Sequence, residues 1–316
     1  MLFSSPIRFC SIALLSGLLL TASIPSAFAQ TFDSGEPYNR QVIELYQQGK
    51  FEEALAPALK GVEIRKVELQ SDHPNLGVSL NNLALVQAAL GNYKEARTLF
   101  RDSLKILESS LGADHLKVAA SLDNHGLIYS YLGEFQKAEA LHLHSLKMRE
   151  NKLGPFHSNI AVSANYLAGV YESQGELKKA EPWEIRSLEV SEKTLGKNHP
   201  NVAASLNNLA LLYANMGEYD LAVPLYRRAL IISEKVFGPD HPNIAIALNN
   251  LADMLEKKGD YAKAEPLFAK AFEIRNRHFQ KENSERRVAQ NSVDRVREKI
   301  ERIKEQYIGS VTLEEE

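Results

Sequence analysis

A glycine recurs every 42 residues through most of this 316-residue chain, and this period constrains the fold more than any other feature. The series consists of Gly49, Gly91, Gly133, Gly175, Gly217 and Gly259. An apolar or aromatic residue stands two positions after each glycine, and an alanine stands five positions after it. Self-similarity at a fixed period of this length is typical of a solenoid, in which one structural unit stacks on the next. The sequence therefore predicts six units joined without insertions.

Each unit is predicted to consist of two helices joined at the glycine. In the unit around Gly217, an apolar stripe with helical spacing precedes the glycine. It comprises Leu206, Leu209, Ala210 and Tyr213. A second stripe follows the glycine, which suits the turn because it adopts the left-handed backbone conformation without steric cost. We expect an all-α fold of six helix pairs, each with a helix A and a helix B, over residues 36–280.

Residues 1–29 have the layout of a secretory signal peptide. Arg8 precedes a nine-residue apolar run at 12–20, and Ala27 and Ala29 form a small-residue cleavage signal. The run is well short of the roughly 20 residues that a spanning helix needs, which favours cleavage after Ala29 over an uncleaved anchor. We expect a periplasmic or secreted protein with no membrane span after cleavage. Cleavage also removes Cys10, the only cysteine, and with it any disulfide, thiol nucleophile or thiolate metal site.

The chain resembles the 42-residue tetratricopeptide repeat of kinesin light chains. The resemblance is carried by residues 199–210, which read His-Pro-Asn-Val-Ala-Ala-Ser-Leu-Asn-Asn-Leu-Ala, and by residues 226–230, which read Tyr-Arg-Arg-Ala-Leu. It implies a right-handed superhelix, an α-solenoid, whose concave wall is made by the A helices and binds peptides or protein segments. The motor-associated role of kinesin light chains is not carried over, because fold alone does not define function and this chain has an export signal.

Two neighbouring columns on the predicted A helices are rich in asparagine. The first column is Asn39, Asn81, Asp123, Asn165, Asn207 and Asn249, and the second is Arg40, Asn82, Asn124, Tyr166, Asn208 and Asn250. Both lie away from the apolar stripe and are expected to point out of the helix-pair core. Asparagine is a middling helix former, but its amide can pair with the backbone of an extended peptide. We interpret these columns as a peptide-binding groove; alternatively, the amides bond to neighbouring A helices and hold the stack together.

The spacing of the helices sets the length of the expected ligand. Adjacent A helices lie roughly 10 Å apart and an extended chain advances about 3.3 Å per residue, so each unit would face about three ligand residues and the whole groove roughly fifteen. Clamps that hold carboxylates use lysine and arginine, whereas here Arg40 and Lys257 are the only basic residues placed on this wall. The predicted partner is a neutral or mildly basic protein segment. With 37 basic against 40 acidic residues, nucleic acid is not an expected partner.

A histidine column also follows the 42-residue period. It consists of His73, His115, His157, His199 and His241. Zinc needs nitrogen ligands at about 2.0–2.1 Å, and equivalent positions roughly 10 Å apart cannot share one ion. We interpret these histidines as part of the helix starts, where proline and a polar capping residue are favoured. The sequence has no nucleophile elbow, P-loop, H-E-x-x-H or dinucleotide fingerprint, so we expect a non-enzymatic protein without a cofactor or metal.

The last part of the chain is strongly charged and carries one narrow apolar stripe. The stripe consists of Val293, Val296, Ile300, Ile303 and Tyr307. A solenoid needs a terminal element with one apolar and one polar face, so we expect a capping helix over 281–308, with a coiled-coil dimer as the alternative and a disordered acidic tail at 309–316. The predicted function is binding of an extended segment in the groove. The alternative is a structural scaffold of the cell envelope that uses the convex B helices or the terminal helix.

Overall fold

The computed structural model describes residues 33–278 and 290–302, and all regular elements within these ranges are helices. The helices are α1 (Glu36–Gln47), α2 (Phe51–Glu68), α3 (Pro74–Ala89), α4 (Tyr93–Leu111), α5 (Leu116–Tyr131), α6 (Phe135–Leu153), α7 (Ser158–Ser173), α8 (Leu177–Leu195), α9 (Pro200–Asn215), α10 (Tyr219–Phe237), α11 (Pro242–Lys257) and α12 (Tyr261–His278), followed by a helix at 290–302. The all-α fold with consecutive helix pairs is confirmed. The expected signal peptide at 1–29 and the tail at 309–316 lie outside the described residues.

The turn inside each pair is closed by the periodic glycine. All six glycines of the series have φ between 73° and 86°, as expected for the left-handed conformation. At the first turn, the amide of Lys50 donates to the carbonyl oxygen of Leu45 at 2.9 Å, which closes the end of α1. A second glycine column with the same period and positive φ ends helices α4, α6, α8 and α10. It consists of Gly112, Gly154, Gly196 and Gly238.

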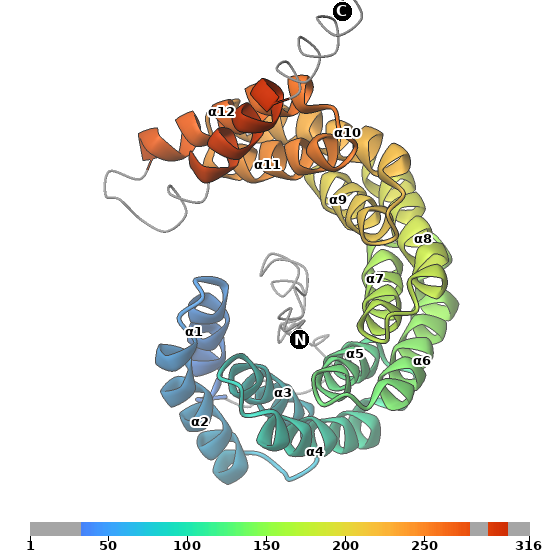
Figure 1. Cartoon of the computed structure of the whole chain (residues 1–316). Helices are drawn as coiled ribbons and strands as arrows, with labels where there is room; N and C mark the ends of the chain where they lie inside the picture. The colour runs from blue at the N-terminus through green and yellow to red at the C-terminus, as the bar shows by residue number, and fades with distance from the viewer. Residues whose placement is uncertain (1–32, 279–289, 303–316) are drawn as a thin grey trace, which may run out of the picture. The chain divides into compact units, whose positions relative to one another are not determined.

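Two compact units make up the chain: unit 1 ends at Trp183 and unit 2 begins at Glu184, inside α8. In unit 1, α1 contacts α3, α3 contacts α5 and α5 contacts α7, while α1, α3 and α5 also pack on α2, α4 and α6, respectively. The odd-numbered helices of unit 1 therefore line one side of the stack and the even-numbered helices the other (Figure 1). Its core includes fully buried Phe100 and Leu107 of α4.

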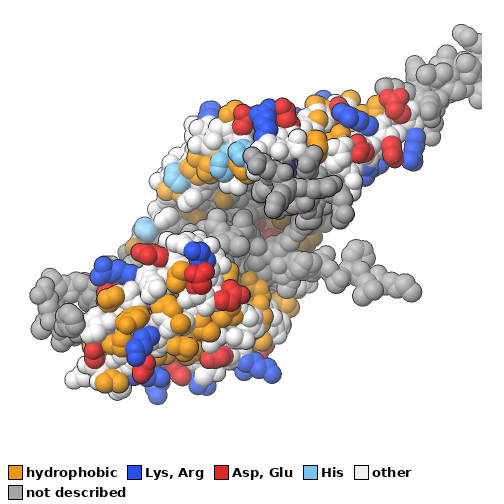
Figure 2. Space-filling view, turned by 90° about the vertical axis from the view of Figure 1, so that its left-hand side faces the viewer, with side chains coloured by type: hydrophobic (Ala, Val, Ile, Leu, Met, Phe, Trp, Pro, Cys, Tyr) orange, Lys and Arg blue, Asp and Glu red, His pale blue; other side chains and the backbone are white. Residues whose placement is uncertain are grey.

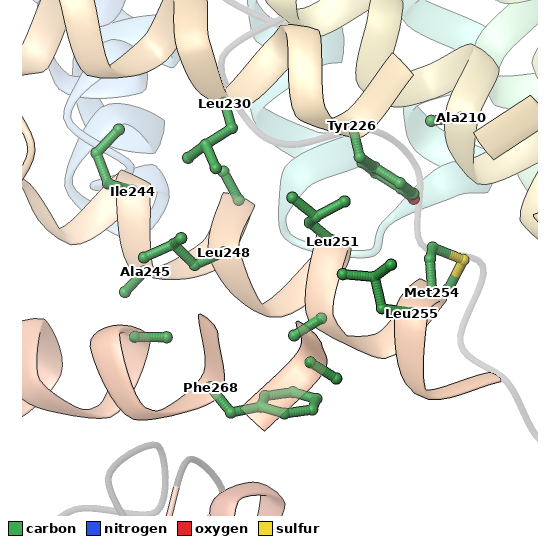
Figure 3. Packing of buried hydrophobic residues seen from close by; sticks show 14 of the residues in the cluster. Ala210, Tyr226, Leu230, Ile244, Ala245, Leu248, Leu251, Met254, Leu255 and Phe268 are labelled. Carbon is green, nitrogen blue, oxygen red and sulfur yellow. The ribbon is translucent and has the colours of Figure 1, made fainter. Parts of the chain in front are cut away.

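The core of unit 2 lies between α10, α11 and α12. Leu248 and Leu251 of α11 are buried between Tyr226 and Leu230 of α10 on one side and Phe268 of α12 on the other (Figure 3). This stripe of α11 is the counterpart of the apolar stripe predicted for the A helices. Burial of a side chain of this size contributes about 1.5–3 kcal/mol, so one apolar stripe per helix is enough to fix the stacking.

The helix at 290–302 closes the end of unit 2. Val293 and Val296 are buried in the core of this unit, and Ile300 packs beside them. Val293 and Val296 follow Leu251 and Met254 of α11 by 42 residues, so the helix is in register with a seventh helix A. At the positions of Ala252 and Leu255, which pack in the core, it carries Asp294 and Arg297, both exposed. The helix therefore has no apolar face for a further helix B, as a terminal cap requires.

Candidate peptide-binding surface

The odd-numbered helices α3, α5, α7, α9 and α11 are all positioned in the same way at their first residue. Each begins directly after a histidine of the periodic column, whose Nδ1 accepts a hydrogen bond from the backbone amide two residues further on, at 3.1–3.2 Å. The interpretation of these histidines as helix starts is confirmed. Sequence reasoning missed that the imidazole is itself the cap, since the usual N-cap residues are Ser, Thr, Asp and Asn.

In unit 1, asparagines of the two columns join neighbouring odd-numbered helices. Asn82 Nδ2 donates to Asn39 Oδ1 at 2.8 Å, and Asn124 Nδ2 donates to Asn81 Oδ1 at 3.1 Å. Each bond spans 43 residues, from the second column of one repeat to the first column of the repeat before it. All four side chains are buried. In these repeats the amides hold the stack together, which is the alternative that the sequence left open.

The column of Asp123 predicts that this residue points out of the helix-pair core, but its side chain lies inside the core. Its carboxylate is fully buried and lies 2.6 Å from Arg149 Nη1, 2.9 Å from His142 Nδ1 and 2.9 Å from the donating Ser145 Oγ, all on α6. Burial raises the pKa of Asp123, but the Arg149 charge and the hydrogen bonds from His142 and Ser145 outweigh it and hold the pKa below its ordinary value. The correction has a simple cause: aspartate carries a charge that a buried arginine on the next helix neutralises.

The two non-asparagine members of the second column behave differently from each other. The Arg40 side chain is exposed and pairs with Glu36 at 3.5 Å. The ring of Tyr166 stacks on His142 with centroids 5.0 Å apart, and its hydroxyl is buried without a hydrogen-bond partner in the described part of the chain. Burial raises the pKa of Tyr166 well above its ordinary value. Neither residue reproduces the amide pairing of Asn82 and Asn124.

In unit 2 the amide oxygens of the first-column asparagines accept no hydrogen bond from the described residues. Asn207 of α9 and Asn249 of α11 are half-buried, as are Asn208 and Asn250 beside them and Asn165 on α7 of unit 1. The amide oxygens of Asn207 and Asn249 are buried and accept no hydrogen bond from any described residue. Asn250 follows Asn207 by the same 43 residues that separate the bonded pairs of unit 1, yet it does not supply the missing donor.

Exposed apolar side chains lie on the same face as these amides. Leu211 is four residues after Asn207 and is 41% exposed; Ile246 is three residues before Asn249 and is 53% exposed. Residues three and four apart share a helix face, so each open amide oxygen has an aliphatic neighbour. Half-buried Asp253 lies one turn beyond Asn249, and burial raises its pKa. This surface can accept N–H donors and bury apolar side chains.

The described residues contain no group of three or more His, Cys, Asp or Glu side chains placed to hold a metal ion. None of the described helices is long and apolar enough to cross a membrane.

An all-helical array of 42-residue helix pairs, with amides along its odd-numbered helices, defines a helical-repeat protein. The family model of the tetratricopeptide repeat matches residues 38–109, 78–151, 159–230 and 202–277, which together cover more than half of the chain. The chain belongs to the tetratricopeptide repeat family. Repeats of this family are protein–protein interaction modules that bind protein or peptide partners and are typically non-enzymatic.

Several solved structures are similar to this chain in fold. A substitution variant of a Podosopora anserina protein described as a kinesin light chain with nearly identical TPR-like repeats is 26% identical; the match covers 63% of this chain and 94% of that one, with a TM-score of 0.55. BtubC from P. vanneervenii is 20% identical over 78% of this chain and 94% of its own, with a TM-score of 0.60. The APC/C hetero-tetramer Cut9–Hcn1 is 16% identical; the match covers 90% of this chain and 45% of that one, with a TM-score of 0.57. No curated protein matches the chain.

Proposed function

We propose that this chain binds an extended polypeptide segment along the face of its odd-numbered helices. The observation that supports this most is the pair of open amide oxygens on Asn207 and Asn249. A buried acceptor without a donor is unfavourable, and the backbone N–H groups of an extended segment would satisfy both. Leu211 and Ile246 would at the same time lose exposed apolar surface to the ligand.

Nine of the twelve residues of the two columns are given a role in this proposal. Asn39, Asn81, Asn82 and Asn124 stabilise the stack of unit 1 through amide–amide bonds, and Asp123 belongs to its core. Ligand contacts fall to the half-buried amides of unit 2, which also include Asn208 and Asn250. The partner is a neutral or mildly basic segment, because the amides offer no charge that would select an acidic one.

Selection from a displayed library of random fifteen-residue peptides tests this function. We expect the full chain to enrich a set of peptides, and the Asn207→Ala/Asn249→Ala double variant to bind them about tenfold more weakly, because two hydrogen bonds to the ligand are lost. Circular dichroism checks that the variant is folded. Ile231→Ser, at an exposed position of α10, is the matched control and is expected to bind normally. Unchanged peptide affinity in the folded double variant would refute groove binding.

A second candidate is a scaffold that uses the even-numbered helices. Several large apolar side chains of these helices are exposed, and Figure 2, which looks onto α1 and α2, shows apolar side chains interspersed with charged ones. They include Leu59, Val67, Leu143, Ile185, Leu221 and Phe237. In that case Ile231→Ser would weaken a protein partner while the asparagine variant would not.

The proposal includes export of the chain. The support is the order of Arg8, the apolar run at 12–20 and the Ala27-Phe28-Ala29 signal. N-terminal sequencing of the protein recovered from the producing cells is expected to start at Gln30. A chain that keeps Arg8 and remains inside the cell would contradict it.

A further inference from the structure

His125 is a buried imidazole at a position where four other repeats carry leucine. It lies on α5 and is 6% exposed. Its ring stacks on Tyr129 of the same helix, with centroids 4.8 Å apart, and on fully buried Phe100 of α4, with centroids 6.2 Å apart. The imidazole therefore takes the place of an aliphatic side chain in the contact between α4 and α5. The leucines of this column are Leu83, Leu167, Leu209 and Leu251.

A second buried imidazole in unit 1 has surroundings of the opposite charge. Nδ1 of His142 on α6 lies 2.9 Å from Oδ1 of Asp123, a carboxylate that can balance a proton on that ring. The two ring nitrogens of His125 are buried and have no hydrogen-bond partner among the described residues. The charges that act on His125 are those of Arg97 and Arg101 on α4, and both disfavour a proton on its ring. Two histidines of one unit thus differ in what a proton would meet.

The other helices that contact α5 add few charges near this ring. Helix α3 has no charged residue, and the only one of α7 is Glu172, at its C-terminal end. On α6, Lys137 lies over the Tyr129 ring, 5.3 Å from its centroid, and pairs with Glu134, which also pairs with the first of the two arginines of α4. Burial, assisted by these two arginines, lowers the pKa of His125 from the ordinary 6.5 to about 4.

Protonation of His125 would therefore strain the contact between α4 and α5. A charged imidazole without a counter-ion is unfavourable in a dry core, and the ring gains water only by leaving its stacks with Phe100 and Tyr129. The residue before it, Asn124, donates to Asn81 of α3 at 3.1 Å. A displacement of α5 that exposes the ring would also break this amide link between neighbouring odd-numbered helices.

We infer that His125 is an acid-sensitive switch of unit 1: uptake of a proton by its ring opens the contact between α4 and α5 and loosens the stack of odd-numbered helices. The opened chain binds the proton at the ordinary pKa of 6.5 and the closed chain only at about 4. The closed state therefore loses stability as pH falls from 6.5 to about 4, and loses no more below that. Unit 2 carries Leu209 and Leu251 in this column, so the response is confined to unit 1.

Hydrogen exchange with mass spectrometry on the full chain at pH 7 and pH 4.5 tests this switch. After correction for intrinsic exchange rates, we expect the protection of residues 93–131 to fall about fiftyfold more between these pH values in the wild-type chain than in His125→Leu. His125→Gln keeps a polar side chain without a titratable group and is expected to behave like His125→Leu. His144→Gln, at an exposed position of α6, is the matched control and is expected to keep the wild-type response.

The variants distinguish His125 from the other groups that titrate in this pH range. An equal fall in the wild-type chain and in folded His125→Leu would overturn the switch, because the fall would then come from groups that both chains share, such as the His115 cap. A full response in His125→Gln, or its loss in His144→Gln, would overturn it as well. A fall that is smaller in both His125 variants, unchanged in His144→Gln and concentrated in α4 and α5 would support it.

Discussion

Glu172 of α7 is half-buried and has no counter-ion among the described residues, and this has a measurable effect on the free chain. Its pKa rises from an ordinary 4.5 to about 7 on folding, because burial disfavours the charged form. The folded chain then binds the proton more tightly than the unfolded chain, so stability falls as pH rises from 4.5 to 7 and stays reduced above that. We expect Glu172→Gln to raise the free energy of unfolding by about 1–2 kcal/mol at pH 8 and to have no effect near pH 4. Urea unfolding at the two pH values measures this; an equal gain at both would point to packing instead of charge.

Asp123 and Arg149 form a buried pair that is expected to matter far more than surface pairs. Arg149→Met leaves the carboxylate of Asp123 uncompensated in the core, which typically costs about 3–5 kcal/mol. Arg101→Met removes an exposed pair with Asp102 and is expected to change stability by less than about 1 kcal/mol. Denaturant midpoints of the two variants decide the comparison. Equal midpoints would mean that the Asp123 carboxylate is solvated or neutral when Arg149 is absent.

At the scale of the element, the histidine cap of α5 makes this helix sensitive to acid. Nδ1 of His115 accepts the amide of Lys117 only when it carries no proton. Burial, assisted by Lys117 and Lys152, lowers the pKa of His115 below the ordinary 6.5. The unfolded chain therefore takes up this proton first, and the stability from the cap is present above pH 6.5 and lost as pH falls through the lower, folded value. We expect His115→Ala to cost about 1 kcal/mol at pH 8 and little at pH 4. A pH-independent cost in thermal or urea unfolding would contradict this.

The helix at 290–302 is expected to be required for the stability of unit 2. Val296 is fully buried there, so Val296→Asp places a carboxylate in the core and is expected to destabilise unit 2 by at least about 3 kcal/mol. Asp294→Ala, on the exposed side of the same helix, is the control and is expected to stay within about 0.5 kcal/mol. Limited proteolysis followed by mass spectrometry reports where the chain opens. Cleavage confined to unit 1 in the Val296→Asp variant would argue against this role.

At the scale of the whole molecule, the 42-residue period was sufficient to predict the helix pairs and their glycine turns. The terminal helix was predicted from its own apolar stripe, of which Val293, Val296 and Ile300 lie in the described residues. Apolar columns and positive-φ glycines act through local geometry, which one repeat already contains. The candidate site was less predictable, because the partners of its side chains come from other repeats. Asn82 and Asn207 stand in equally amide-rich surroundings in the sequence, yet only the first takes part in an amide–amide bond. The direction of Asp123 depends on Arg149, whose column carries leucine or serine in three other repeats and arginine in two, at Arg65 and Arg275.

The first and last described helices carry polar residues at some positions where the equivalent helices of other repeats carry apolar ones. At the positions of Leu80, Leu83 and Val86 of α3, helix α1 carries Tyr38, Gln41 and Glu44, and the last two are exposed. The helix at 290–302 carries exposed Asp294 and Arg297 at the positions of Ala252 and Leu255 of α11. In the described part of the chain, these polar residues stand on the first and last helices, whereas the helices between them carry mostly apolar residues at the same positions.

Because the polar residues are on the end helices, the number of internal repeats can change without exposing additional apolar surface. In-frame duplication of one internal period, for example residues 200–241, would insert one helix pair between two existing helix pairs. The first and last helices would not change. Each such event would add room for about three ligand residues. A single duplication can thus lengthen the ligand-binding surface by one whole repeat without exposing buried apolar residues.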